Sequence, residues 1–210
     1  MELYKVYSKH PFTMIISGPS GAGKSVWVKR LIEQSSSVCS PPPKKIFYFY
    51  TEYQPLFSDM PGVTFIQGLS EEMIERLGEE PCWIILDDLM DDASDSKIVS
   101  DLFTKVSHHR DISVILILQN FFVKGKQMRN ITLNSSYLVL MKNPRDKNIA
   151  SYIARQIYPN RAKKFRQMYE DVTKNPFTYL FIDLKADTPE EIRLLSNVLG
   201  EKDYISVYRI

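Results

Sequence analysis

Six continuous apolar runs mark the chain, and polar or amphipathic stretches separate them. The runs are TMIIS (13–17), IFYFY (46–50), CWIIL (82–86), ISVILIL (112–118), YLVLM (137–141) and YLFIDL (179–184). Continuous apolar runs are typical of strands buried on both faces, whereas strands with one exposed face alternate apolar and polar residues. The pattern predicts a three-layer α/β sandwich, in which helices cover both sides of a mostly parallel central sheet.

A helical pattern separates the third and fourth of these runs. Five apolar residues fall there on one side of a 3.6-residue helix, namely Ile98, Val99, Leu102, Phe103 and Val106. We expect the N-cap of this helix at Ser94 or Asp95. Because a strand, a helix and a strand in succession form the unit of a parallel sheet, the order of elements favours parallel pairing.

The remaining segments complete one predicted domain. The stretch SSSVCSPPPKK (35–45) is too polar and proline-rich for a helix or a central strand, and we expect a surface loop. Beyond Pro144 the pattern predicts helices at 146–157, 160–172 and 189–199, and a last strand in YISVYRI (204–210). A length of 210 residues suits a single domain spanning 1–210, with its core at about 11–184 and a C-terminal helix and strand at 185–210.

Composition and charge exclude several classes of protein. Lysine and arginine total 27 and aspartate and glutamate 25, so the net charge is +2 and any contact with DNA must be local. Cys39 and Cys82 are too few for a disulfide framework and lack the spacing of a zinc site, which indicates a reducing, intracellular compartment. The chain starts without the apolar core of a signal peptide, and its apolar runs fall far short of the ~20 residues that span a bilayer, so we expect no membrane insertion.

The most specific short motif is GPSGAGKS, which follows the first apolar run and precedes a helical pattern. Its residues are Gly18, Pro19, Ser20, Gly21, Ala22, Gly23, Lys24 and Ser25. They match G-x-x-x-x-G-K-[ST], in which glycines let the backbone N–H groups turn inward around a β-phosphate. Lys24 would bridge the β- and γ-phosphates, Ser25 would bind Mg²⁺, and the helix dipole would face the anion. A turn that binds nothing is the alternative, and the strand and helix around the motif argue against it.

Two carboxylates follow the third apolar run. Asp87 and Asp88 lie at the carboxyl end of a predicted buried strand, where open α/β sheets bind their ligands. Asp87 is the expected Mg²⁺ ligand, acting through water, and Asp88 the general base or water-orienting group. Many hydrolytic P-loop enzymes have Glu at the second position, and Asp is one methylene shorter. For Asp91, Asp92 and Asp95 we favour a solvated, helix-capping loop.

The fourth apolar run ends in two amides. If this strand lies between the first strand and the acidic strand, the sheet has the ASCE arrangement, and Gln119 reaches a place where it can sense the γ-phosphate. Asn120 is the second choice, and a polar pair that simply ends a strand is the alternative. Glu52, just beyond IFYFY, is a weaker candidate for switching the attacking water.

Basic residues lie on both sides of YLVLM. They are Lys124, Lys126, Arg129, Arg145 and Lys147. Basic residues of this kind are often simply exposed to solvent on the protein surface. The alternative is that one arginine completes the site of a neighbouring subunit while others contact a DNA backbone. Arg129 is the first choice for an arginine finger that enters the neighbouring subunit's site, and Arg145 is the second. A later helix carries Arg161, Lys163, Lys164 and Arg166, which can face DNA or solvent.

These segments together resemble a known family. GPSGAGKS, WIILDDLMDD and above all LILQNFFVKGKQMRNITLNSSYLVLMKNPRDK followed by ARQIYP are similar to the FtsK/HerA-type packaging ATPases of large DNA viruses, such as the poxvirus-like ones, and of Polinton or Maverick elements and adintovirus-like relatives. The resemblance covers about residues 11–183. The long third segment is its most specific part, since the phosphate loop is shared by many unrelated proteins.

The resemblance implies a Mg²⁺-dependent ATPase that assembles into a homo-oligomeric ring and pumps double-stranded DNA into a capsid, within an infected cell or with the virion. By position it makes Lys24 and Ser25 the ATP and Mg²⁺ ligands, Asp87 the metal aspartate, Asp88 its catalytic neighbour and Gln119 the sensor. Arg129 transfers less directly as the arginine finger. A nucleoside or nucleotide kinase and a non-catalytic nucleotide-binding adaptor are the alternatives. A kinase would need an arginine-rich lid, which the sequence does not clearly show.

Overall fold

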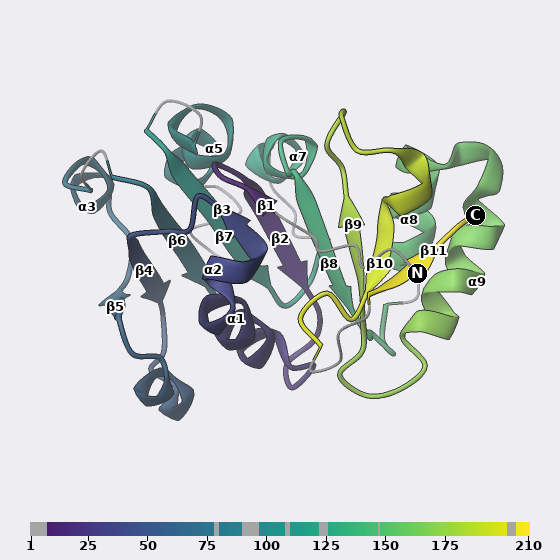
Figure 1. Ribbon diagram of the computed structural model, residues 1–210, viewed down its shortest axis with the longest axis horizontal. Helices are drawn as coiled ribbons and strands as arrows, with labels where there is room; N and C mark the ends of the chain where they lie inside the picture. Colours follow the sequence, from purple (N-terminus) through teal and green to yellow (C-terminus); the bar gives the residue numbers. More distant parts are fainter. Residues whose placement is uncertain are drawn as a thin grey trace.

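The computed structural model describes residues 8–77, 80–89, 97–107, 110–121, 126–146, 148–200 and 205–210. Within these ranges, nine strands form one central sheet in the order β11-β10-β9-β8-β2-β7-β6-β4-β5 (Figure 1). Their bounds are β2 Thr13–Ser17, β4 Lys45–Tyr50, β5 Val63–Gln67, β6 Cys82–Asp87, β7 Ile112–Leu118, β8 Tyr137–Met141, β9 Tyr179–Asp183, β10 Leu194–Ser196 and β11 Ser206–Tyr208. Strands β1 (Ser8–Lys9) and β3 (Cys39–Ser40) pair separately.

The sheet is mostly parallel, as the sequence predicts. The six strands from β8 to β5 in this order run parallel, whereas β9, β10 and β11 pair antiparallel at one side. Strand β7, which contains ISVILIL, lies between β2 and β6, so the condition that the sequence left open is met. The carboxyl ends of β2, β7 and β6 therefore meet at one edge, the lower edge in Figure 1.

Helices pack on both faces of the sheet. Their bounds are α1 Lys24–Glu33, α2 Ser35–Val38, α3 Glu71–Glu75, α5 Lys97–Asp101, α7 Lys126–Leu133, α8 Asn148–Ile157 and α9 Ala162–Val172. Short 3-10 helices span Pro55–Asp59, Pro159–Arg161 and Glu190–Ile192, and a π-helical segment spans Leu102–Val106. Among the described residues, no helix is long and apolar enough to cross a bilayer.

Two apolar clusters hold the helices to the sheet. On strand β2, Ile15 belongs to the cluster that contains α5, α7, α8 and α9, whereas Met14 and Ile16 belong to the cluster that contains α1. Neighbouring side chains of a strand point to opposite faces, so a strand covered on both sides must be apolar throughout. This explains the continuous runs in the sequence.

The central helices and the last strand agree with the sequence predictions. Helices α8 and α9 match the helices predicted at 146–157 and 160–172, except that each starts two residues later than predicted. Strand β11 lies within the predicted last strand. Helix α5 and its π-helical extension lie within the stretch predicted to be helical, with Val99, Leu102 and Phe103 buried. The expected N-cap, Ser94 or Asp95, lies outside the described residues.

Three sequence predictions need correction. The surface loop predicted at 35–45 contains one turn of helix, α2, and the short strand β3. The predictions also missed β5, a half-exposed strand at one edge of the sheet. The helix predicted at 189–199 is wrong, because a 3-10 turn and strand β10 lie there instead.

Strand β10 forms because the free side of β9 offers backbone partners to it. Leu194 pairs with Ile182, and Leu195 with Phe181. Leu194 and Leu195 belong to opposite apolar clusters, as the alternation of a strand requires. The segment therefore buries two leucines on two faces, which a helix on one face of the sheet cannot do.

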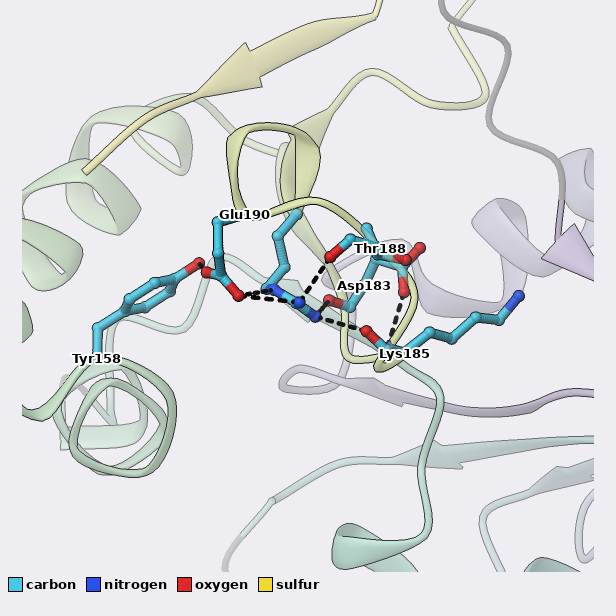
Figure 2. A network of polar contacts seen from close by, with 6 residues as sticks. Tyr158, Asp183, Lys185, Thr188 and Glu190 are labelled. Atoms are coloured by element: carbon cyan, nitrogen blue, oxygen red, sulfur yellow. Dashed lines mark hydrogen bonds and ion pairs between the residues drawn. The ribbon is translucent and has the colours of Figure 1, made fainter.

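The connection from β9 to β10 is held by the buried Arg193, and Figure 2 labels the residues that it contacts. The Arg193 side chain donates to the carbonyl oxygens of Asp183 and Thr188 at 2.8 Å each and of Lys185 at 3.0 Å. It also pairs with Glu190, which in turn accepts a hydrogen bond from the hydroxyl of Tyr158, the residue that follows α8. The guanidinium thus satisfies carbonyls that the turn would otherwise leave without partners.

Candidate nucleotide-binding site

The segment 18–25 forms a tight loop between β2 and α1, as the motif predicts. Gly21 and Gly23 have φ values of 75° and 94°, in the left-handed region that favours glycine. A Cβ on Gly18 would lie only 2.6 Å from Cβ of Met141 on β8, and the Gly18 N–H donates to Leu118 O on β7. The three glycines therefore let the loop curl tightly between neighbouring strands.

The Lys24 ammonium lies over this loop. Its Nζ donates to the carbonyl oxygens of Gly18 and Pro19 at 2.7 and 3.0 Å. Burial lowers the pKa of Lys24 from its usual value, and the nearby charges of Asp87 and Asp88 oppose that shift. The side chain thus begins at the first turn of α1 and ends among the backbone atoms of the loop, close to two carboxylates.

Asp87 is a buried carboxylate at the carboxyl end of β6. Only 4% of its surface is exposed, and Oδ2 accepts hydrogen bonds from the Tyr48 hydroxyl at 2.6 Å and from Gln54 Nε2 at 3.3 Å. Burial raises the pKa of Asp87, and the Asp88 charge adds to this, while the hydrogen bond from Tyr48 and the Lys24 charge oppose it. Because burial disfavours the charged form of Asp87, a cation bound beside it would stabilise the carboxylate.

Sequence reasoning missed Tyr48, which lies on the neighbouring strand β4. Its side chain is fully buried, and its hydroxyl donates to Asp87. Burial raises the pKa of Tyr48 far above its usual value, the Asp87 charge adds to this, and a hydrogen bond from Ser25 opposes it. Tyr48 thus donates to one predicted metal ligand, Asp87, and lies near the other, Ser25. The available signal was a tyrosine in the middle of a buried apolar run, since a buried hydroxyl needs a partner.

Asp88 and Gln119 meet at the carboxyl ends of β6 and β7. Gln119 Nε2 donates to Asp88 Oδ1 at 2.8 Å, and the Thr51 hydroxyl donates to the Asp88 carbonyl at 2.8 Å. Asp88 has a φ of 55°, in the left-handed region that non-glycine residues rarely adopt. The predicted base and the predicted sensor are therefore in direct contact, on a strained turn held from two sides.

One cavity of about 560 Å³ joins these groups at the sheet edge. Its lining includes Ser20, Gly21, Gly23, Lys24, Ser25, Asp87, Asp88 and Gln119 from the predicted set, together with Glu52 and the unpredicted Tyr53, Gln54 and Phe177. Backbone amides, an ammonium, a hydroxyl and carboxylates converge here. That donor set fits a Mg²⁺–triphosphate, because amides and ammonium bind phosphate oxygens while hydroxyl and carboxylate oxygens bind Mg²⁺.

The predicted basic residues lie elsewhere. Arg129 is exposed on α7 and Arg145 is exposed after β8, and the described lining of the cavity includes neither. Arg161, Lys163, Lys164 and Arg166 are exposed at the start and along one face of α9. Several predicted groups fall outside the described residues: Asp91, Asp92, Asp95, Lys124, Lys147 and the side chain of Lys126.

Comparison with solved structures places this geometry in a known fold. The DNA-packaging ATPase B204 of Sulfolobus turreted icosahedral virus superposes with a TM-score of 0.63 at 12% identity, over 95% of this chain and 98% of that one. The genome-packaging NTPase B204 of Sulfolobus turreted icosahedral virus 2, in complex with ATPγS, gives 0.58 at 12% identity, over 95% and 97%. The flagellar accessory protein FlaH of Methanocaldococcus jannaschii gives 0.54 at 12% identity, over 96% and 91%.

No family model matches the sequence, and no curated protein matches it. The solved structures share the α/β fold of P-loop NTPases with this chain, over nearly its whole length. At 12% identity the likeness extends to the fold alone, and residue roles have to be argued from this chain's own geometry.

Proposed function

We propose that this protein is a Mg²⁺-dependent ATPase of the FtsK/HerA type that drives double-stranded DNA into a capsid. The observation that carries the proposal is one cavity lined by Ser20, Gly21 and Gly23 of the phosphate loop together with Lys24, Ser25, Asp87, Asp88 and Gln119. The order β2-β7-β6, with one strand between the loop strand and the acidic strand, supports an ASCE-type, RecA-like core.

Each residue has a distinct role in this proposal. The loop amides and Lys24 bind the β- and γ-phosphates, and Ser25 and Asp87 hold Mg²⁺, which would neutralise phosphate charge. Tyr48 orients Asp87 through its hydroxyl, so it positions this metal ligand. Asp88 orients and deprotonates the attacking water, and Gln119 fixes the direction of the Asp88 carboxylate.

The motor function rests on the fold and on the resemblance in sequence. B204, whose fold this chain shares, is described as a genome-packaging NTPase. A homo-oligomeric ring would let the exposed Arg129 of α7, or Arg145, reach the cavity of a neighbouring subunit and stabilise the transferring phosphoryl group. A ring would also gather a few basic residues per subunit around DNA, although the net charge of one chain is only +2.

Asp88→Asn separates nucleotide binding from turnover. We expect this variant to bind Mg²⁺–ATP as the unchanged protein does but to release phosphate at least about a hundredfold more slowly, because the amide cannot accept a proton from water. Calorimetry measures nucleotide binding, and phosphate release with and without double-stranded DNA measures turnover. Normal turnover by Asp88→Asn would overturn the role of Asp88.

The same assays distinguish the alternatives. Phosphorylation of an added nucleoside or nucleoside monophosphate in place of DNA-stimulated phosphate release would indicate a kinase. Tight binding of ATP by the unchanged protein, with no turnover at any DNA concentration, would indicate an adaptor that uses the nucleotide only to set its conformation.

A further inference from the structure

An exposed aromatic ring stands beside the phosphate loop in a strained position. Phe177 is 70% exposed and has a φ of 61°, in the left-handed region. It follows Pro176 in the turn before β9, a place where turns with a positive φ usually have Gly or Asn. A bulky side chain in this conformation is strained, and strained residues of this kind cluster at ligand sites.

The surrounding loop holds the ring against the phosphate loop. Cδ1 of Phe177 lies 3.2 Å from where a Cβ on Gly23 would stand, so the ring fills the space that this glycine leaves. After β8, Lys142 donates from its N–H to Thr178 O and from Nζ to Lys174 O, on both sides of Phe177. The position of the ring is therefore built into the fold.

Phe177 lines two cavities. One is the 560 Å³ cavity that is also lined by Lys24, Ser25 and Asp87. The other is a hollow of about 170 Å³, lined by Trp27 and Arg30 of α1, by Tyr179, by Ser196 at the end of β10 and by Asn197 after it. Trp27 and Arg30 follow Lys24 by one and two helical turns, so this hollow extends about 9 Å along α1 from the phosphate loop.

The order of strands fixes which end of a nucleotide comes here. Asp87, Asp88 and Gln119 follow β6 and β7, on one side of the phosphate loop, while Phe177 precedes β9 on the other side. Figure 1 shows the loop from α9 to β9 along the same lower edge of the sheet as the start of α1. A triphosphate whose terminal phosphate lies beside the carboxylates must therefore direct its nucleoside toward β8 and β9.

We propose that Phe177 is the stacking platform for the base of the bound nucleoside triphosphate, and that the hollow beside Trp27 and Asn197 receives this base. The inference rests on the proposed function, because it assumes a triphosphate in the loop. An exposed aromatic face suits any base, since every base has a π-face. Thr178, Ser196 and Asn197 line the hollow and give it a polar wall, although the Thr178 and Ser196 hydroxyls also bond to Asn175 O and to the Tyr208 hydroxyl.

The test compares a nucleotide with a triphosphate that has no base. Phe177→Asn removes the ring but keeps a residue that tolerates the left-handed conformation, so the loop should retain its shape. We expect calorimetry to show that this variant binds Mg²⁺–ATPγS about 5- to 150-fold more weakly, the range for loss of one stacked aromatic ring, and inorganic tripolyphosphate unchanged. Phe177→Trp should retain ATPγS affinity.

Tyr152→Ala provides a matched control, because it removes an exposed aromatic ring on α8, outside the described lining of both cavities. It should leave binding of both probes unchanged. Equal ATPγS affinity in Phe177→Asn and in the unchanged protein would overturn the platform. An equal loss of ATPγS and tripolyphosphate would also overturn it, since the ring would then only support the loop. If the unchanged protein binds neither probe, the proposed function itself is wrong.

Discussion

At the scale of single residues, the cavity concentrates groups that oppose folding when nothing is bound. Asp87 is buried, and its pKa is raised chiefly by loss of solvent. Lys24 is half-buried, and its pKa is lowered chiefly by the same loss of solvent. Hydrogen bonds from Tyr48 and Gln54 reduce the penalty on Asp87 without removing it. Sites arranged to bind charge commonly sacrifice stability in this way.

Asp87→Asn should therefore stabilise the ligand-free protein. Because folding raises the pKa of Asp87, the stability linked to this group is greatest below its unfolded pKa and falls as the pH rises through the folded value. At neutral pH we expect a rise in melting temperature of roughly 2–4 °C, which about 1 kcal/mol gives in a chain of this size. Thermal unfolding at mildly acidic and neutral pH measures it, and the advantage of the variant should shrink at the lower pH. A lower melting temperature for Asp87→Asn at neutral pH would show that Tyr48 and Gln54 more than offset burial.

At the scale of elements, the sequence predicted the strands whose residues are buried on both faces. It did not predict strands that form only by pairing with a strand remote in sequence or at the sheet edge. The central strands were predictable because both their faces are covered, so every residue is apolar. Strand β5 was not predictable in this way, because VTFIQ lies at an edge of the sheet and is half exposed, so its residues are not all apolar. The spacing of Ile192, Leu195 and Leu199 suits a helix, and only the free side of β9, remote in sequence, makes β10 a strand.

The site was predictable to the same degree. GPSGAGKS and the two aspartates follow strands in a fixed local pattern, so Lys24, Ser25, Asp87 and Asp88 meet in one cavity as expected. Tyr48 and Phe177 belong to no such fixed motif, and aromatic residues in apolar or loop segments usually serve packing; the hydroxyl of Tyr48 within an apolar run was a weaker signal. Tyr48 lies at the cavity because β4 pairs with β6, and Phe177 lies there because the turn before β9 has a positive φ.

The turn before β10 gives a test at this scale. Arg193→Ala should lower the free energy of unfolding by about 2–4 kcal/mol, because it leaves three backbone carbonyls and Glu190 without their charged donor. Urea unfolding measures this change. Arg166→Ala, which removes an exposed arginine 3.9 Å from Glu170, should change stability by less than about 0.5 kcal/mol. Similar changes in the two variants would contradict a structural role for the network in Figure 2.

At the scale of the whole molecule, the sheet organises the proposed chemistry along one edge. The metal and water-activating groups follow β6 and β7, the phosphate loop follows β2, and the aromatic platform precedes β9. Hydrolysis would change the contacts between Asp88, Gln119 and the γ-phosphate.

Steady-state phosphate release from Mg²⁺–ATP, measured for the unchanged protein and for Lys24→Ala with and without double-stranded DNA, tests this account most directly. We expect DNA-stimulated release by the unchanged protein and only background release by Lys24→Ala, since that variant loses the ammonium that binds the phosphates. Equal rates in the two proteins, or no release by the unchanged protein at any DNA concentration, would contradict the assignment of the cavity as an ATPase site.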